Sequence, residues 1–115
     1  MLTYRSREKI PCTILSFADG DTVLVLSQCP TCGSYKKQYV RLKGIDSFEE
    51  RSSDRKRVLV IKEKWNTLLA GKSAELICTQ NSSDKYGRVV GDIVIDGFHL
   101  TKKLVDEGDA WYSSK

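Results

Sequence analysis

Three short clusters of charged residues carry the side chains that could do chemistry in this sequence. The clusters are Asp19-Gly20-Asp21-Thr22, the segment from Arg41 to Glu49, and Asp84-Lys85-Tyr86-Gly87-Arg88. Each cluster alone has a plain structural explanation, because Asp-Gly pairs and charged loops commonly form turns between strands. Together they supply paired carboxylates, a further glutamate and two arginines, which is the inventory of a reactive site.

That inventory suits the attack of water on a phosphodiester. Asp21 and Asp46 offer the hard carboxylate oxygens that Ca²⁺ and Mg²⁺ prefer, and Glu49 is a third carboxylate able to polarise water. Arg41 and Arg88 are permanent cations whose planar guanidinium groups fit phosphate oxygens. The reaction needs a neutralised phosphate, an activated water and stabilisation of the extra negative charge in the transition state.

Length and composition limit what can position these residues. The 115 residues predict a single domain over 1–115, and 40% hydrophobic with 30% charged residues excludes a disordered or collagen-like chain. No apolar run approaches the 18 residues that cross a bilayer, and the first seven residues lack the apolar region of a signal peptide. We therefore expect no membrane partner. His99 is the single histidine, which excludes mechanisms that need two imidazoles.

The positive charge gathers in the middle of the chain. The net charge is +4, and residues 31–64 hold ten basic and five acidic residues, so this segment is the candidate phosphate-facing part. A solvated helix face would explain the basic residues of 55–64 equally well. Tyr4, Tyr35 and Tyr39 could stack on bases beside this segment, although strands favour tyrosine in any case.

The four cysteines give no complete metal motif. Cys29 and Cys32 form a CxxC, but Cys12 and Cys78 are isolated, and a structural zinc site normally needs a second ligand pair. Three interpretations stay open for the CxxC: a reduced turn, a short-range disulfide, or a contribution to a metal knuckle.

Hydrophobic periodicity predicts strands over residues 10–18, 22–26, 38–43, 73–79 and 89–95. A helix is predicted from residue 54, with a cap at Ser53 or Asp54, an apolar face that includes Trp65, and an end at Gly71. A short helix from about His99 closes at Gly108. This order favours an α+β fold, mainly β: a five-stranded OB-fold-like barrel capped by a helix after the third strand. A split α+β sandwich is the alternative.

Four motifs in order make the sequence resemble the staphylococcal nuclease (thermonuclease) family. They are DGDT at 19–22, RLKGID at 41–46 followed by an acidic residue three positions on, DKYGR at 84–88, and LVDEGDAW at 104–111. The resemblance implies an OB-type barrel and Ca²⁺-dependent cleavage of DNA and RNA with little sequence preference, leaving 3′-phosphate ends. Single strands are the favoured substrate, and we expect a monomer.

Carried over residue by residue, the resemblance implies a role for each site residue. Asp21, Asp46 and the backbone carbonyl of Ser47 would hold Ca²⁺. Glu49 would act as general base or water-orienting group. The scissile phosphate would be clamped by Arg41 and Arg88. The other nucleotide phosphate would contact Lys85 and Tyr86.

The chain departs from the family pattern at two informative positions. Phe48 precedes Glu49 where the family commonly has proline, and Asp109 stands where an apolar residue is usual. A proline fixes φ and stiffens its loop, so Phe48 bears on how Glu49 is placed. Besides the nuclease, two other hypotheses follow: a catalytically inactive nucleic-acid-binding OB-type module, and a protein-interaction domain.

Overall fold

The computed structural model describes residues 9–28, 33–47, 55–83 and 89–113. Its elements, in chain order, are β1 (Lys9–Asp19), β2 (Thr22–Gln28), β3 (Tyr35–Leu42), β4 (Ile45–Ser47), α1 (Arg55–Leu69), β5 (Ser73–Ser83), β6 (Val89–Ile95), β7 (Phe98–His99), α2 (Leu100–Asp106) and β8 (Ala110–Tyr112). The five long strands and two helices match the predicted elements, with ends shifted by a few residues.

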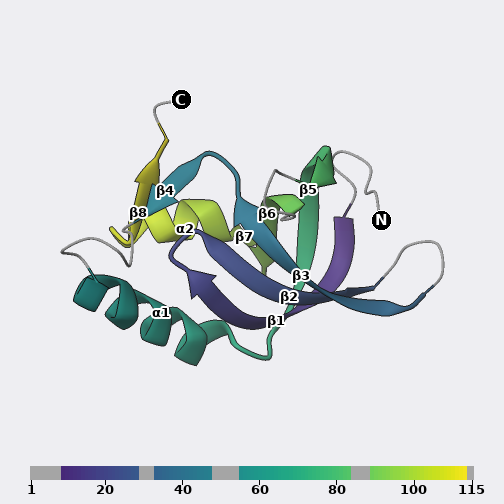
Figure 1. Ribbon diagram of the computed structural model, residues 1–115, viewed down its shortest axis with the longest axis horizontal. Coiled ribbons are helices and arrows are strands. Elements are labelled where there is room, and N and C mark those ends of the chain that lie inside the picture. The colour runs from purple at the N-terminus through teal and green to yellow at the C-terminus, as the bar shows by residue number, and fades with distance from the viewer. Residues whose placement is uncertain (1–8, 29–32, 48–54, 84–88, 114–115) are drawn as a thin grey trace.

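Five strands close into a barrel, shown in Figure 1. Strand β1 pairs antiparallel with β2 and β5, β2 pairs with β3, and β5 pairs with β6. A parallel pairing of β3 with β6, in which Val40 lies beside Val89 and Leu42 beside Gly91, closes the ring. The predicted OB-fold-like α+β architecture is therefore confirmed, and the sandwich alternative is not observed.

The core fills the barrel because alternate residues of each strand point inward. Val23 and Val25 of β2 and Val40 and Leu42 of β3 are fully buried, whereas the residues between them reach solvent to some extent. The apolar face of α1 covers the barrel beside β1, as the periodicity predicts. Its Trp65 is only 2% exposed.

One side-chain hydrogen bond fixes where α1 meets the barrel. Asn66 Oδ1 accepts a hydrogen bond of 2.7 Å from the backbone N–H of Phe17 in β1. The rings of Phe17 and Trp65 lie next to this bond, with centroids 6.2 Å apart. The helix ends as predicted, since Gly71 has φ +85°, a conformation that favours glycine.

The structure adds three short strands that the sequence does not predict. β4 pairs antiparallel with β8 in a separate two-stranded sheet, and β7 pairs with the end of β6. With two or three residues each, they are too short to show an alternating pattern, and β4 and β8 are far apart in the chain. Neither helix in the described part of the chain is long and apolar enough to cross a membrane.

Candidate active site

The turn between β1 and β2 places Asp21. Asp19 Oδ1 accepts the backbone N–H of Gly20 at 2.9 Å, which closes the turn. The carbonyl of Asp21 then accepts the N–H of Leu42 at 2.9 Å, so the end of β3 lies directly beside the turn. The hydroxyl of Thr22 lies 3.1 Å from Asp21 Oδ1 and donates to it. These bonds fix the Asp21 carboxylate next to Arg41, the residue opposite Thr22.

The guanidinium of Arg41 is the centre of the site. Its Nη2 lies 3.0 Å from Asp46 Oδ1 and 3.5 Å from Asp21 Oδ2, so both carboxylates converge on one nitrogen. The guanidinium also donates to two backbone carbonyls, at 2.5 Å to Leu42 and 2.7 Å to Ile45. Arg41 thus bridges the ends of β3 and β4 and partly neutralises the two acidic side chains.

The small sheet of β4 and β8 places Asp46 and Ser47. Asp46 lies opposite Trp111 and Ser47 opposite Ala110, and the N–H of Ser113 donates 2.8 Å to the carbonyl of Gly44. The segment that carries Asp46 and Ser47 is therefore held by the pairing with β8 as well as by Arg41 of the barrel strand β3.

Gly20 leaves the room that Ser47 needs. A Cβ added at Gly20 would collide with Ser47 Oγ and stand 2.7 Å from Ser47 Cβ, well inside van der Waals contact. The glycine of the DGDT motif is thus required by the close approach of the β1–β2 turn to strand β4, not by its backbone angles.

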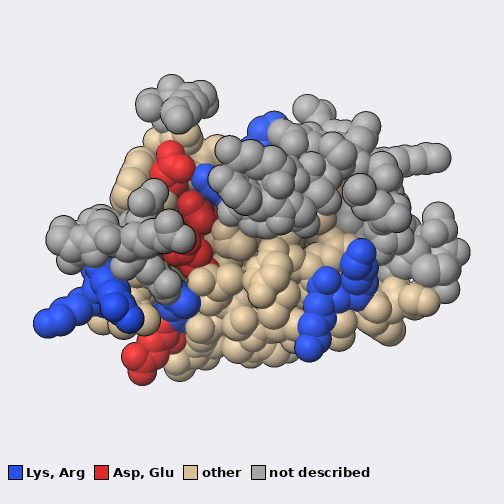
Figure 2. Space-filling view, viewed as in Figure 1, with Lys and Arg blue, Asp and Glu red and all other residues tan. Residues whose placement is uncertain are grey.

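Four of the predicted site residues therefore come together: Asp21, Arg41, Asp46 and Ser47. Their exposure is graded, since the side chain of Asp46 is 46% exposed, that of Arg41 21% and that of Asp21 17%. Figure 2 shows acidic and basic side chains side by side on this face, at the end of the molecule that carries β4 and β8 in Figure 1. Asp46 is therefore the outermost of the three charged side chains, and the guanidinium and Asp21 lie deeper.

The other predicted residues lie outside the described residues. These are Glu49, Lys85, Tyr86 and Arg88, together with Phe48 and the Cys29/Cys32 pair. The strand that follows the DKYGR motif is described, and its Val89 and Val90 lie beside Val40 and Arg41.

The donor chemistry of the site fits a hard divalent cation. Asp21 and Asp46 present carboxylate oxygens around one positive group, the arrangement that a Ca²⁺ ion also requires. Within the described ranges no group of three or more His, Cys, Asp or Glu side chains is placed to hold a metal ion. A complete ligand set thus needs more than these two carboxylates, and the prediction assigns the next ligand to a backbone carbonyl.

Sequence reasoning missed two residues that build the site. It gave Thr22 no role beyond its motif and Gly20 only a role in the turn, whereas the structure shows Thr22 bonded to Asp21 and Gly20 packed on Ser47. The small size of residue 20 within an acidic motif is the signal that could have suggested a close approach.

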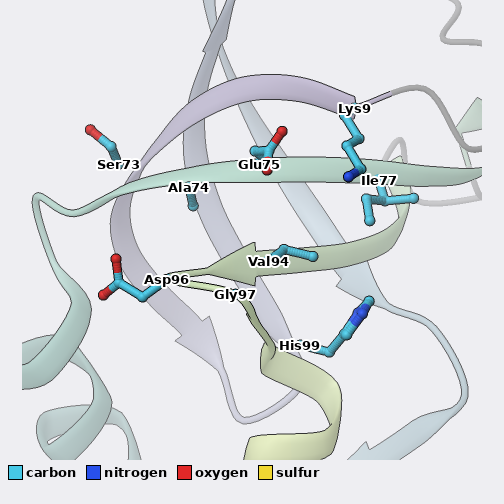
Figure 3. A pocket seen from close by; sticks show the side chains of 9 residues that line it. All are labelled: Lys9, Ser73, Ala74, Glu75, Ile77, Val94, Asp96, Gly97 and His99. Atoms are coloured by element: carbon cyan, nitrogen blue, oxygen red, sulfur yellow. The ribbon is translucent and has the colours of Figure 1, made fainter.

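A cavity lies elsewhere on the barrel. It has a volume of about 570 Å³ and is lined by residues of β1, β5, β6 and β7, including Lys9, Glu75 and His99 (Figure 3). Asp21, Arg41, Asp46 and Ser47 do not line it. His99 Nδ1 lies 2.7 Å from Asp92 Oδ2, so the imidazole is held at the start of α2.

Cys12 and Cys78 are both buried, and no disulfide bond joins these two described cysteines. Burial raises the pKa of the Cys12 thiol from 9.0 to about 12, and the nearby Glu75 carboxylate adds to the rise. A thiol that is neutral at every physiological pH is a poor nucleophile and a poor metal ligand. Cys12 is therefore a core residue.

Comparison with known proteins agrees with the geometry. Residues 39–115, about two thirds of the chain, match the family described as "Staphylococcal nuclease homologue". The protein named "Probable staphylococcal-like nuclease CAN1" from Oryza sativa subsp. japonica is 35% identical over 77 residues, and an "Uncharacterized 38.1 kDa protein" from Capnoides sempervirens has the same identity over the same length. These stretches cover 67% of this chain and 22% and 21% of the two relatives, so the chain spans about a fifth of their length.

The family match begins within β3, so it includes Arg41 and Asp46 but not Asp21. Asp21 joins them through the pairing of β2 with β3 and through its ion pair with Arg41. The family match over residues 39–115 and the 35% identical relative agree with the observed barrel, and the chain belongs to the staphylococcal nuclease family.

Proposed function

We propose that this chain hydrolyses phosphodiester bonds of DNA and RNA with little sequence preference, depends on Ca²⁺ and leaves 3′-phosphate ends. The observation that carries the proposal is the placement of Arg41 between Asp21 and Asp46, with contacts of 3.5 and 3.0 Å. A permanent cation flanked by two hard carboxylates at an accessible surface is suited to bind both a phosphate and a divalent cation.

Different residues of the site have different roles in the proposed reaction. Asp21, Asp46 and the Ser47 carbonyl would hold Ca²⁺, which when bound neutralises phosphate charge and makes a water molecule more acidic. Arg41 has five N–H donors, and its contacts within the described part of the chain use three of them. The remaining two are suited to phosphate oxygens, where they stabilise the charge that grows in the transition state.

Four residues outside the described ranges complete the proposed mechanism. Glu49 orients or deprotonates the attacking water, Arg88 is the second phosphate clamp, and Lys85 and Tyr86 contact the other phosphate of the nucleotide. Since phosphate contacts carry no sequence information, little base preference is expected. Single strands are favoured over duplexes, because a splayed nucleotide reaches a small site more readily. We expect the active species to be a monomer.

The test is cleavage of end-labelled single-stranded DNA and RNA with Ca²⁺, with Mg²⁺ and with chelator, followed by analysis of the fragment ends. Cleavage that requires Ca²⁺ and leaves 3′-phosphates is the expected result. Binding without cleavage under all conditions would replace the proposal with the inactive binding module. Absence of both binding and cleavage would favour a protein-interaction domain.

Two substitutions separate chemistry from metal binding. Glu49→Gln should slow cleavage while Ca²⁺ affinity is retained, because it removes the base and leaves the predicted ligands. Asp46→Asn should weaken Ca²⁺ binding itself, which calorimetry measures. Full activity of Glu49→Gln would show that the assigned role of this residue is wrong.

A further inference from the structure

Strand β3 presents a row of aromatic and basic side chains on one face. Successive residues of a strand point to opposite sides, and Val40 and Leu42 point into the core, where both are fully buried. The alternate residues therefore lie on the outer face of the barrel. In chain order these are Tyr35, Lys37, Tyr39 and Arg41.

The two tyrosines of this row are both largely exposed. Tyr35 is 67% exposed and Tyr39 50%. The residues directly opposite them on β2 are Gln28 and Leu24, which are half-buried and share the same face. Both tyrosines therefore lie beside partly buried β2 residues and are largely accessible on the outer face.

This part of β3 has one described neighbour. Its pairing with β6 involves only Val40, Arg41 and Leu42, so the described pairing of Tyr35–Tyr39 is with β2 alone. In Figure 1 β2 and β3 continue together as a ribbon beyond the rest of the barrel. Among the described residues, the outer face of this ribbon is accessible at Tyr35 and Tyr39.

The positive charge of strand β3 indicates what kind of ligand this face would bind. Residues 35–43 contain four basic residues and no acidic one, although the whole chain is nearly balanced. Aromatic rings that alternate with cations suit single-stranded nucleic acid, because bases stack on the rings and phosphates pair with the cations. The row also ends at Arg41, the centre of the candidate active site, so a strand lying on it leads directly to the phosphate-binding guanidinium.

We infer that Tyr35, Lys37 and Tyr39 form a binding track for single-stranded nucleic acid that guides the strand to Arg41. The inference deepens the proposed nuclease function and rests on it. Residues two apart on a strand are spaced by about 7 Å, so Tyr35 lies about 20 Å from Arg41 along the strand. The track therefore contacts several nucleotides on one side of the cleaved bond.

The experiment measures binding and cleavage separately. Binding of a fluorescein-labelled oligothymidylate of about twelve nucleotides, within the range of site sizes for one OB fold, is followed by anisotropy in chelator. The variants are the double substitution Tyr35→Thr/Tyr39→Thr and its conservative counterpart Tyr35→Phe/Tyr39→Phe. Threonine keeps β propensity but has no ring, and circular dichroism checks the fold. Val60→Thr on α1, where Val60 is 65% exposed, is the matched surface control.

The Thr variant should bind the long oligonucleotide at least about tenfold more weakly, since each lost base stack costs about a factor of ten. The Phe variant and the Val60 control should bind like wild type. Cleavage of a dinucleotide with Ca²⁺, which does not reach the track, should be equal in all four proteins. Lys37→Gln should lower the slope of log affinity against log salt by about 0.7.

The outcomes distinguish this inference from the proposed function. The inferred binding track is wrong if the Thr variant binds the oligonucleotide as tightly as wild type. It is also wrong if wild type does not bind the oligonucleotide. Wild-type binding that is lost in the Thr variant supports the track even where no protein cleaves. In that case only the nuclease proposal fails.

Discussion

Asp109 accepts a hydrogen bond from the buried indole N–H of Trp65, with 2.7 Å between Oδ2 and Nε1. The same carboxylate oxygen lies 3.0 Å from the ammonium of Lys64, whose nitrogen is 5.1 Å from the Trp65 ring centre. Asp109 therefore ties α1 to the start of β8. This explains why an acidic residue stands in the tail motif where the family usually has an apolar one.

Asp109→Leu should destabilise the fold by about 1–3 kcal/mol, because a buried N–H would lose its acceptor. Urea unfolding measures this loss. Lys64→Met is the control, and it should cost at most about 1 kcal/mol, since the Lys64 side chain is 39% exposed. Equal losses in the two variants would assign the effect to the ion pair instead of the indole bond.

Gly20→Ala should reduce cleavage on the order of a hundredfold, the effect expected for a displacement of about 1 Å at a reacting group. The added Cβ would push Ser47, and with it the neighbouring Asp46, out of position. Thermal unfolding should show a folded protein. Ser47→Gly removes the colliding atoms, so the double variant should recover part of the lost rate. A double variant no faster than Gly20→Ala would contradict this account of the glycine.

Arg41→Gln should affect Ca²⁺ binding and cleavage in opposite directions. Glutamine is shorter and uncharged, so it removes the positive charge that lies within 3.5 Å of both carboxylates. Ca²⁺ should then bind more tightly, because like charges repel, while cleavage should fall by about 10²- to 10³-fold through loss of a transition-state donor.

Calorimetry and single-turnover cleavage measure the two effects, and Lys102→Gln, a charge change on the exposed face of α2, is the matched control. Weaker Ca²⁺ binding in Arg41→Gln would show that the guanidinium builds the cation site by holding β4 in place.

The sequence predicted the barrel well because its long strands and α1 have regular apolar spacing that local sequence displays. Asp21, Arg41 and Asp46 could be named from their motifs, yet their contacts depend on β4 and β8, whose pairing joins distant parts of the chain. The hydrogen bond from Trp65 to Asp109 and the close approach of Gly20 to Ser47 are likewise tertiary contacts between residues far apart in the chain. Apart from the small residue at position 20, local patterns carry no signal for such contacts, because the contacts exist only after the barrel has closed.

Cys12 should make the stability of the protein depend on pH in alkaline solution. Its pKa is about 12 in the fold, from burial and then Glu75, against 9.0 without these effects. Below pH 9 the thiol is neutral in both folded and unfolded chains and contributes no pH dependence. Between pH 9 and 12 only the unfolded chain ionises, so stability should fall by up to about 1.4 kcal/mol per pH unit.

Urea unfolding of wild type and Cys12→Ala at pH 8 and pH 10.5 isolates this effect, because other titrating groups are common to both proteins. Wild type should lose more stability than the variant between the two pH values, so any advantage of the thiol at pH 8 should shrink. An unchanged difference between the two proteins would mean that the thiol ionises inside the fold as readily as outside it, and that water reaches this part of the core.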